Sequence, residues 1–411
     1  MKNLIILLVI HFNLNAQYLW QISSDKIVRW SYIDGDEFNK NTVNKDKWLT
    51  KLPWSNAVLS QDIYYLEKNI KFENGNIQFI LNKENNLYPL QSWEMDTILF
   101  KKNKITLTDG NKFPFKYTGG LLYTKKEYKY GYFEIRFKAS EGQGIWPAFW
   151  LFGAKPNNEI DFFELKGEKE NELHVDIHCP DGCGNFKEGP LGYYRKGWGH
   201  WIKTNQKFKD SYNIISGEWT KNYIKWYLNG ELIAYSNHSY DLGMNLTAGT
   251  GIGKDNGAFG PGSNKETPFP NYFNVDYIRV YKTDTLPSYD EIKNNLGNSE
   301  NLVHPKTEND YKIKKAKNKL TNNPDKKLNQ NRIITLSVIQ LTKTNLSIRI
   351  LGVTSKDKVN IQIKVNNDTE VISEMQLDQN NELIVPIPEN KNLTLHAVIN
   401  NQKITELLFF Q

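Results

Sequence analysis

The sequence lacks the features that stabilise very small folds or carry a chain across a membrane. Among its 411 residues are 2 cysteines, and no stretch after residue 16 is apolar enough to span a bilayer. A chain of this length buries enough apolar surface to fold without disulfides. Nucleic-acid-binding motifs are also lacking, and much of the net charge of +6 comes from the seven Lys of residues 312–327. We therefore expect no transmembrane segment and no nucleic-acid partner.

The N-terminus has the pattern of a secretory signal peptide. Lys2 precedes the apolar run 4–10, and the small residue Ala16 follows where cleavage is expected. No cysteine lies beside that point to carry a lipid anchor. We expect residues 1–16 to be removed and the protein to be secreted, to the periplasm, the cell surface or the medium.

The two cysteines, Cys179 and Cys183, stand close together in HCPDGCG. An exported protein meets oxidising conditions, so the main expectation is a disulfide within one small loop. A zinc site that also uses His174 and His178 is the alternative, although the spacing fits no standard zinc finger.

Residues 31–283 form a succession of short β-like runs separated by Gly, Asn, Asp and Pro clusters. Many strands without helical periodicity predict an all-β antiparallel sandwich. Within YLNGEL, Asn229 and Gly230 fit a type I′ turn between two paired strands. Residues 17–30 are expected to be an N-terminal extension.

A second, smaller β domain is predicted at the C-terminus. Residues 284–331 are rich in Lys and Asn and predict a linker, whereas residues 332–411 return to strand-like runs and predict a small β-sandwich. This C-terminal part contains neither Trp nor Tyr, which sugar-binding surfaces use to stack on sugar rings. A spacer or sorting role is therefore expected, with contact to the cell surface or the secretion machinery.

The stretch NNEIDFFELKG carries three carboxylates, Glu159, Asp161 and Glu164, on an otherwise apolar strand. Strand side chains alternate between faces, so Glu164 should point away from the other two. A β-bulge near Phe162 or Phe163 would insert one residue and bring all three to one face. Retaining glycoside hydrolysis needs such a group: one carboxylate as nucleophile and one carboxylic acid as proton donor.

The flanking runs favour a polysaccharide cleft over an ordinary acidic strand face. In GQGIWPAFWLFG, Trp146 and Trp150 share strand parity, and in ELHVDIH alternation puts His174 and His178 on one face with Asp176. Aromatic rings that stack on sugars and polar groups that bind hydroxyls are what such a cleft requires. We expect substrate contacts from these two Trp and two His residues.

The run YGYFEIRFKASEGQGIWPAFWLFG followed by EIDFFE closely resembles the signature region of glycoside hydrolase family 16. DEFN, KFENGNIQF, SGEWTKNYIKWYLNGEL and FNVDYIRVYK resemble further family landmarks in the expected order, over about 250 residues. The resemblance implies a concanavalin-like β-jelly-roll sandwich and retaining endo-cleavage of a β-linked polysaccharide. It assigns Glu159 as nucleophile, Asp161 as its electrostatic helper and Glu164 as general acid and base.

The resemblance implies no cofactor for catalysis and a structural calcium, whose ligands would be Asp276 and the carbonyl of Gly75. The sequence departs from the family pattern at AKPNNE, at the cysteine loop and in LTAGTGIGKDNGAFGPG, where substrate subsites are expected. The first substrate hypothesis is a laminarin-type β-1,3-glucan. The alternatives are a galactanase for agar, porphyran or carrageenan, a transglycosylase, and a non-catalytic polysaccharide-binding sandwich.

Overall fold

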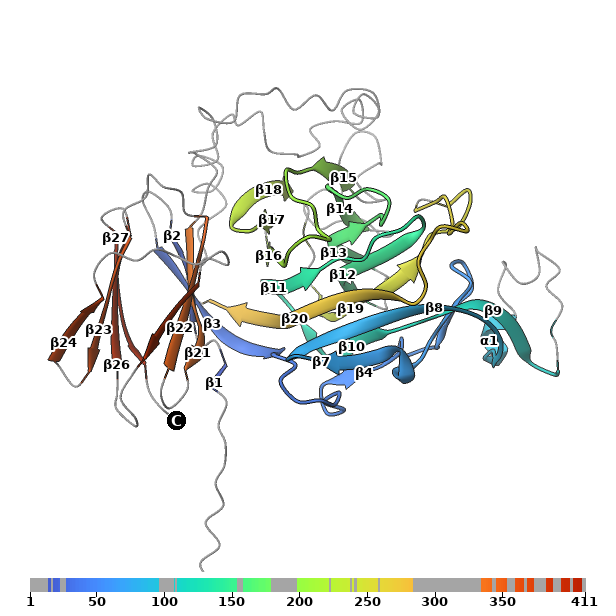
Figure 1. Cartoon of the computed structure of the whole chain (residues 1–411), viewed down its shortest axis with the longest axis horizontal. Coiled ribbons are helices and arrows are strands. Elements are labelled where there is room, and N and C mark those ends of the chain that lie inside the picture. Colours follow the sequence, from blue (N-terminus) through green and yellow to red (C-terminus); the bar gives the residue numbers. More distant parts are fainter. Residues whose placement is uncertain are drawn as a thin grey trace, which may run out of the picture. The chain divides into compact units, whose positions relative to one another are not determined.

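The computed structural model describes two compact units, one within Asp34–Val280 and a smaller one that combines residues of Met1–Ile33 with residues of Arg332–Gln411 (Figure 1). Among the residues described, no helix is long and apolar enough to cross a membrane. The described residues are 14–15, 18–22, 27–95, 107, 109–153, 158–178, 198–221, 223–236, 239, 242–257, 259–283, 334–341, 345–352, 359–365, 368–372, 382–386, 393–399 and 402–408.

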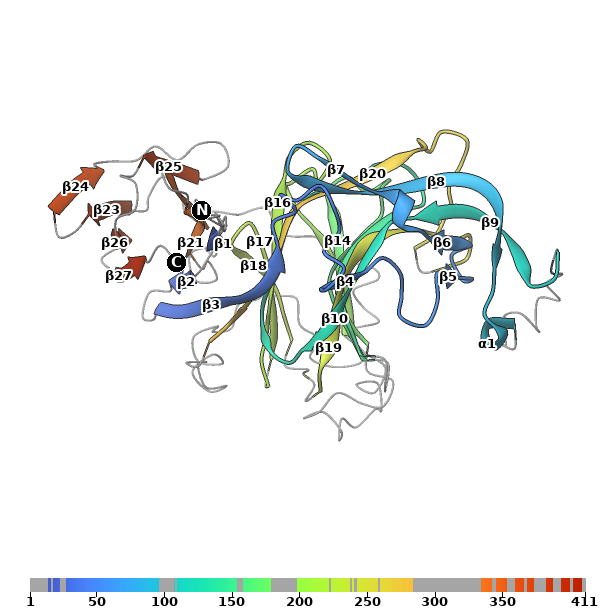
Figure 2. The same ribbon diagram turned by 90° about the horizontal axis from the view of Figure 1, so that it is seen from below.

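The larger unit consists of two antiparallel sheets, which we call the first and the second sheet. Figure 2 shows β14 and β19 of the first sheet beside β16 and β17 of the second. In spatial order, the first sheet contains β15 (Trp198–Lys203), β14 (Glu172–His178), β13 (Asn158–Leu165), β12 (Ile145–Gly153), β19 (Met244–Ile252), β10 (Leu121–Tyr128) and β4 (Trp48–Leu49). The second sheet contains β18 (Glu231–Ser236), β17 (Ile224–Leu228), β16 (Asn213–Trp219), β11 (Gly131–Lys138), β20 (Asn271–Lys282), β8 (Asn76–Pro89) and β7 (Ile70–Glu73).

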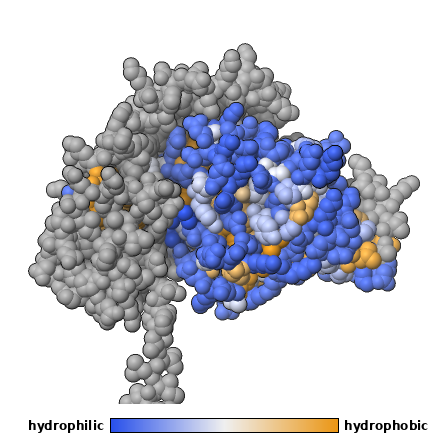
Figure 3. All heavy atoms as spheres, viewed as in Figure 1, coloured by the Kyte–Doolittle hydropathy of each residue, from blue (hydrophilic) through white to orange (hydrophobic). Residues whose placement is uncertain are grey.

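The apolar side chains of alternating strand positions meet between these two sheets and form the main core. From the second sheet come Phe133, Ile135 and Phe137 of β11, and from the first come Val175 and Ile177 of β14. The residues between them on each strand point to the outside of the sandwich. Accordingly, the face of the larger unit seen in Figure 3 is mostly hydrophilic.

A smaller group of elements adds a second apolar cluster to the larger unit. Ile63 and Tyr65 of this group pack with Leu121 and Tyr123 of β10. Leu121 and Tyr123 flank Leu122 on β10, and Leu122 lies in the main core. Because strand side chains alternate, Leu121 and Tyr123 point to the opposite face of the first sheet. The elements are β5 (Ala57–Val58), β6 (Ile63–Tyr65), the 3-10 helix η1 (Glu67–Asn69), helix α1 (Ser92–Met95) and β9 (Lys112–Gly119).

The predicted hairpin at Asn229 and Gly230 is confirmed. Both residues have positive φ, 49° and 83°, as a type I′ turn requires. The flanking residues Leu228 and Glu231 are cross-strand partners, and β17 therefore pairs directly with β18.

Strand β13 contains the irregularity that the spacing of its carboxylates predicts. Its register against β14 shifts between Asp161 and Glu164. Two consecutive residues, Phe162 and Phe163, both lie fully buried in the main core, which a regular strand does not allow. The extra residue resets the alternation, so Asp161 and Glu164 share the outer face.

The second sheet is shaped to hold this bulge. Gly217 of β16 leaves the space that the ring of Phe162 fills: a Cβ atom there would lie 2.0 Å from Phe162 Cε1. Trp226 of β17 donates a hydrogen bond from Nε1 to the backbone carbonyl of Asp161, at 2.9 Å. This hydrogen bond gives the Asp161 carbonyl a partner at the point where the pairing of β13 with β14 is interrupted. A buried carbonyl without a partner would lower the stability of the fold.

In the smaller unit, an N-terminal strand pairs with the C-terminal strands. β2 lies between β3 and β21, and it places buried Trp20 beside a C-terminal part that has no Trp of its own. One sheet contains β1 (Leu14–Asn15), β2 (Tyr18–Ile22), β3 (Ile27–Asp36, up to Ile33 in this unit), β21 (Ile334–Leu341), β22 (Asn345–Leu351) and β25 (Glu382–Pro386). The other contains β24 (Asp368–Ile372), β23 (Val359–Val365), β26 (Leu393–Ile399) and β27 (Gln402–Leu408).

The predicted fold class, an all-β sandwich with a second small β domain, is thus confirmed. The segment 17–30, predicted to be an N-terminal extension, contributes β2 to the smaller unit, where β2 pairs with β21.

The close approach of Gly217 and Phe162 predicts that Gly217→Ala lowers the free energy of unfolding by about 1–3 kcal/mol, as overpacking of a core does. Urea unfolding followed by Trp fluorescence measures it. Gly262→Ala is the matched control, because the nearest atom to its added Cβ lies 3.3 Å away. Equal stability of the two variants would contradict the close packing inferred at the bulge.

Candidate active site

Strands β12 to β15 bring the predicted site residues together on the outer face of the first sheet. Their cross-strand pairing arranges the polar side chains in rows that run across the strands. One row contains Trp201, His174 and Glu164, the next Asp176 and Asp161, and the third His178 and Glu159.

The three carboxylates of β13 form one group with the histidines of β14. One ligand atom each of Glu159, Asp161 and His178 lies within 4.8 Å of the others, and the same holds for Glu164, His174 and Asp176. Such groupings also occur in metal sites, but carboxyl groups that perform acid–base chemistry explain this one without a metal.

The environment of these carboxyl groups favours their protonated forms. Burial raises the pKa of Glu159 to about 7, and the charges of Glu164 and Asp176 add to this effect while the His178 cation opposes it. Burial likewise raises the pKa of Glu164 to about 7. Near neutral pH, the pair can therefore hold one ionised and one protonated carboxyl group, as a nucleophile and an acid require.

The environment of Asp161 also favours its protonated form. It is 2% exposed, and burial together with the neighbouring carboxylates raises its pKa well above the ordinary value. As a neutral acid between the other two, it can donate a hydrogen bond to an ionised neighbour.

Glu164 is held in place by hydrogen bonds to both of its oxygens. Trp146 Nε1 donates to Oε1 at 3.1 Å, and His174 Nδ1 lies 3.1 Å from Oε2. Burial lowers the pKa of His174, so this imidazole is neutral at pH 7. The sequence predicts substrate contact for Trp146 and His174, and the structure gives each a direct contact with the candidate acid.

His178 lies between two carboxyl groups. Its Nε2 is 3.5 Å from Asp161 Oδ2 and 3.4 Å from Asp176 Oδ2. Burial alone would lower the pKa of His178, but the charges of Asp176, Glu159 and Glu164 outweigh it and raise the pKa. Asp176 is a fourth carboxyl group of the site, on the face where strand alternation places it.

The structure also places Trp150 on the site face, where it is the cross-strand partner of Asp161. Its half-buried ring packs against the apolar cluster that contains Ile63 and Tyr123. The predicted disulfide residues Cys179 and Cys183 lie outside the described residues.

Three aromatic side chains, Trp146, Phe259 and Trp201, pack together at one side of Glu164, and we call them the aromatic wall. The sequence did not predict this group. Phe259 stacks on Trp146 with ring centroids 4.1 Å apart and an interplanar angle of 5°, and it also contacts Trp201 and His174. Phe259 therefore covers one face of Trp146, which cannot then stack on a sugar. The sequence signal was the run NGAFGPG, where a single aromatic residue stands among turn residues.

Asp276, one of the two residues suggested for calcium, pairs with a cation of the protein. Asp276 Oδ2 accepts a hydrogen bond from Arg136 Nη1 at 2.6 Å, and the Arg136 guanidinium also lies 4.5 Å from the ring centroid of Tyr212. Arg136 thus already compensates part of the negative charge that the suggested calcium site would use. Gly75, with φ of 76°, forms the turn between β7 and β8.

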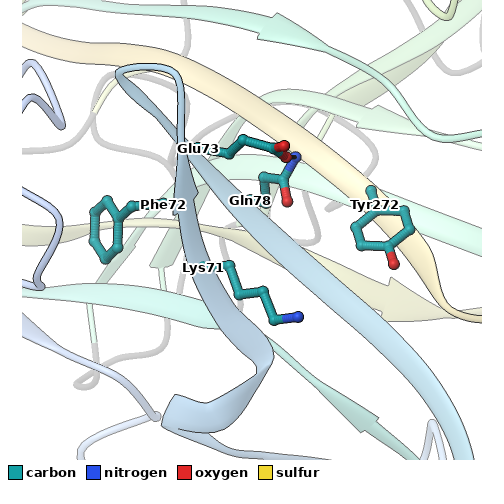
Figure 4. Close-up of a pocket in the computed structure, with 5 residues that line it drawn as sticks. All are labelled: Lys71, Phe72, Glu73, Gln78 and Tyr272. Atoms are coloured by element: carbon teal, nitrogen blue, oxygen red, sulfur yellow. Dashed lines mark hydrogen bonds between the residues drawn. The ribbon is translucent and has the colours of Figure 1, made fainter.

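A separate hollow of about 440 Å³ lies on the second sheet, away from the carboxylates. Figure 4 shows Lys71, Gln78 and Tyr272 on one side of the strands, with Phe72 pointing away from them. Gln78 Nε2 donates to Glu73 Oε2 at 2.9 Å. With a single carboxylate among its lining residues, this hollow does not supply an acid and a nucleophile.

Comparisons with known proteins agree with the geometry. The chain is 27% identical over 277 residues to the glucan endo-1,3-beta-glucosidase A1 of Niallia circulans, covering 60% of this chain and 37% of that protein. It is 26% identical over 241 residues to the kappa-carrageenase of Pseudoalteromonas carrageenovora, covering 47% and 58%. The X-ray structure of endo-beta-1,3-glucanase from Pyrococcus furiosus superposes with a TM-score of 0.51 and 25% identity, over 65% of this chain and 99% of that one.

The chain spans 34–37% of the length of the first curated relatives it matches. Residues 61–249, which include the bulged strand and its neighbours, match the sequence profile of glycosyl hydrolases family 16. Over these residues the larger unit of this chain is therefore similar to glycosyl hydrolases family 16.

Proposed function

We propose that the chain is a retaining endo-β-glycanase. The observation that carries this proposal is the bulged strand β13, which puts Glu159, Asp161 and Glu164 on one face, with the pKa of Glu159 and of Glu164 raised to about 7. A polysaccharide-binding sandwich without activity would need neither the bulge nor the raised pKa values.

The reaction proceeds in two displacements. In the first, the Glu159 carboxylate attacks the anomeric carbon while Glu164 donates its proton to the departing glycosidic oxygen, leaving a glycosyl ester on Glu159. In the second, Glu164 removes a proton from a water molecule that attacks the same carbon and releases Glu159. Two inversions give net retention of the anomeric configuration.

The neighbouring groups prepare this pair for its roles. Trp146 and His174 orient the Glu164 carboxyl group through the hydrogen bonds described above. Protonated Asp161, whose carboxyl group lies within 4.8 Å of a Glu159 oxygen, stabilises the nucleophile as it ionises again in the second step.

Laminarin-type β-1,3-glucan is the first substrate to test, because the relative from Niallia circulans and the structure from Pyrococcus furiosus are endo-1,3-glucanases. A galactan such as agar, porphyran or carrageenan is the second candidate, supported by the similarity to a kappa-carrageenase. Transfer of the glycosyl group to a sugar instead of water would use the same intermediate.

We also propose that the protein is secreted, with residues 1–16 as its signal peptide, and that the cysteine pair forms a loop disulfide. Catalysis in this scheme uses carboxyl groups alone and needs no cofactor. The smaller unit would act as a spacer or sorting domain that contacts the cell surface or the secretion machinery.

Incubation of the wild type with laminarin, lichenan, agarose, porphyran and carrageenan should release oligosaccharides from one polymer. Glu159→Ala should release none, because removal of the nucleophile lowers kcat by several orders of magnitude. Chromatography of the products measures both, and NMR of the first product should show the β-anomer. An α-anomer would exclude the retaining mechanism, and binding without products would favour the non-catalytic sandwich.

The two carboxyl groups can be assigned separately with azide. Azide should restore turnover to Glu164→Ala with a β-glycosyl azide as product, because it replaces water in the second step. In Glu159→Ala it should give the α-product, because it replaces the nucleophile. The reverse outcome would exchange the two roles.

The pH dependence of kcat/KM should be bell-shaped around neutral pH, because Glu159 must be ionised and Glu164 protonated. The His178 cation lowers the pKa of both groups, so His178→Gln should raise both pKa values and move both limbs of the profile to higher pH. Initial rates measured between about pH 4 and pH 10 show how far each limb of the profile moves. Unmoved limbs would show that His178 does not set these pKa values.

Trp226→Phe should lower kcat much more than Trp219→Phe, although both lose one buried hydrogen bond and about 1–2 kcal/mol of stability. Trp226 Nε1 bonds the carbonyl of Asp161 at the bulge, whereas Trp219 Nε1 bonds Ser239 Oγ at 3.2 Å. Denaturant unfolding and steady-state kinetics on both variants separate stability from geometry. Equal losses of kcat would argue against the bulge as the support of the carboxylates.

A further inference from the structure

Lys166 lies two positions after Glu164 and points its ammonium group at the aromatic wall. Its Nζ is 5.4 Å from the ring centroid of Trp201 and 5.6 Å from that of Phe259. It also donates a hydrogen bond to the carbonyl of Gly260 at 2.9 Å. These contacts fix the position of the cation against Trp201 and Phe259, two rings that also contact His174.

In the part of the chain that the structure describes, no ion pair within 4.0 Å neutralises Lys166, whereas its neighbours are paired. Lys169 has an ammonium group at the same distance, 5.4 Å, from the same ring of Trp201, but it is ion-paired with Glu172 at 2.5 Å. Lys169 thus has a carboxylate partner that compensates its charge, whereas Lys166 has no such partner among the described residues.

The groups around Lys166 leave its positive charge available at the candidate active site. Burial raises the pKa of Glu164 to about 7, and His174 is neutral at pH 7 because burial, with a contribution from the Lys166 charge, lowers its pKa. One of the three ammonium donors bonds Gly260, so two remain for a ligand. A half-buried ring of Trp201 beside these donors suits the face of a sugar.

We propose that Lys166 binds an anionic substituent, a sulfate ester or a carboxylate, on the sugar that contacts Glu164. The enzyme then cleaves a β-glycan that carries such groups in preference to the same backbone without them. This inference rests on the proposed endo-β-glycanase activity and narrows its substrate class. Lys166 is a specificity residue and takes no part in bond cleavage.

The test compares polymers that share a backbone and differ in charge: laminarin with sulfated and with carboxymethylated laminarin, and κ-carrageenan with its desulfated form. The ratio of kcat/KM on the anionic polymer to that on the neutral one should fall roughly tenfold in Lys166→Gln, the loss typical of one charge-assisted hydrogen bond. Lys166→Arg should keep the ratio. Lys169→Gln is the matched control and should change it by less than about twofold, as an already paired exposed charge does.

An unchanged ratio in Lys166→Gln would overturn this inference and leave the endo-glycanase proposal intact. An equal loss in Lys169→Gln would overturn it as well, because the preference would then follow the general positive charge of the region. Preference for the sulfated or for the carboxymethylated polymer identifies the anionic group.

A binding measurement tests Lys166 even if no polymer is cleaved. Calorimetry with Glu159→Ala should show tighter binding of sulfated than of neutral laminarin oligosaccharides, and the double variant Glu159→Ala/Lys166→Gln should lose that difference. Retention of the difference would overturn the role of Lys166. Failure of the wild type to cleave any polymer would instead count against the proposed function.

Discussion

The site depends on one irregularity, the extra residue in β13 between Asp161 and Glu164. A regular strand would point Glu164 into the core, where a carboxyl group has no partner. The bulge instead buries both Phe162 and Phe163, and their rings stack on Phe133 and Phe137 of the second sheet at 5.3 and 4.3 Å. The apolar core thus stabilises the displaced backbone and, through it, the position of the acid.

The same burial that holds the strand sets the chemistry of its carboxyl groups. Water would leave Glu159 and Glu164 ionised at neutral pH, but burial raises the pKa of each to about 7, and neighbouring acids add to the shift of Glu159. The positive charge of protonated His178 opposes this shift, and Asp176 in turn raises the pKa of His178. The site is therefore one coupled charge system in which each histidine and carboxylate influences the protonation of its neighbours.

The sequence predicted the parts of this arrangement that follow from local spacing. Strand alternation, the turn at Asn229 and the parity of Glu159, Asp161 and Glu164 are short-range properties, and they were sufficient for the sandwich and the bulge. Contacts between distant segments could not be derived in this way. Nothing near Gly217 indicates that it faces Phe162, nothing near Tyr18 indicates pairing with residue 334 onward, and Arg136 is 140 positions from Asp276.

The aromatic wall shows how such distant contacts affect the substrate. Phe259 lies in a loop after β19, yet it covers Trp146 of β12 and lies against Trp201 of β15. Because Trp146 is occupied by Phe259 and by Glu164, it serves to orient the acid, and Trp201 remains as the ring beside the Lys166 charge. The proposed reaction type follows from β13 alone, whereas the proposed choice of polymer depends on side chains that the loop after β19 brings together with β12 and β15.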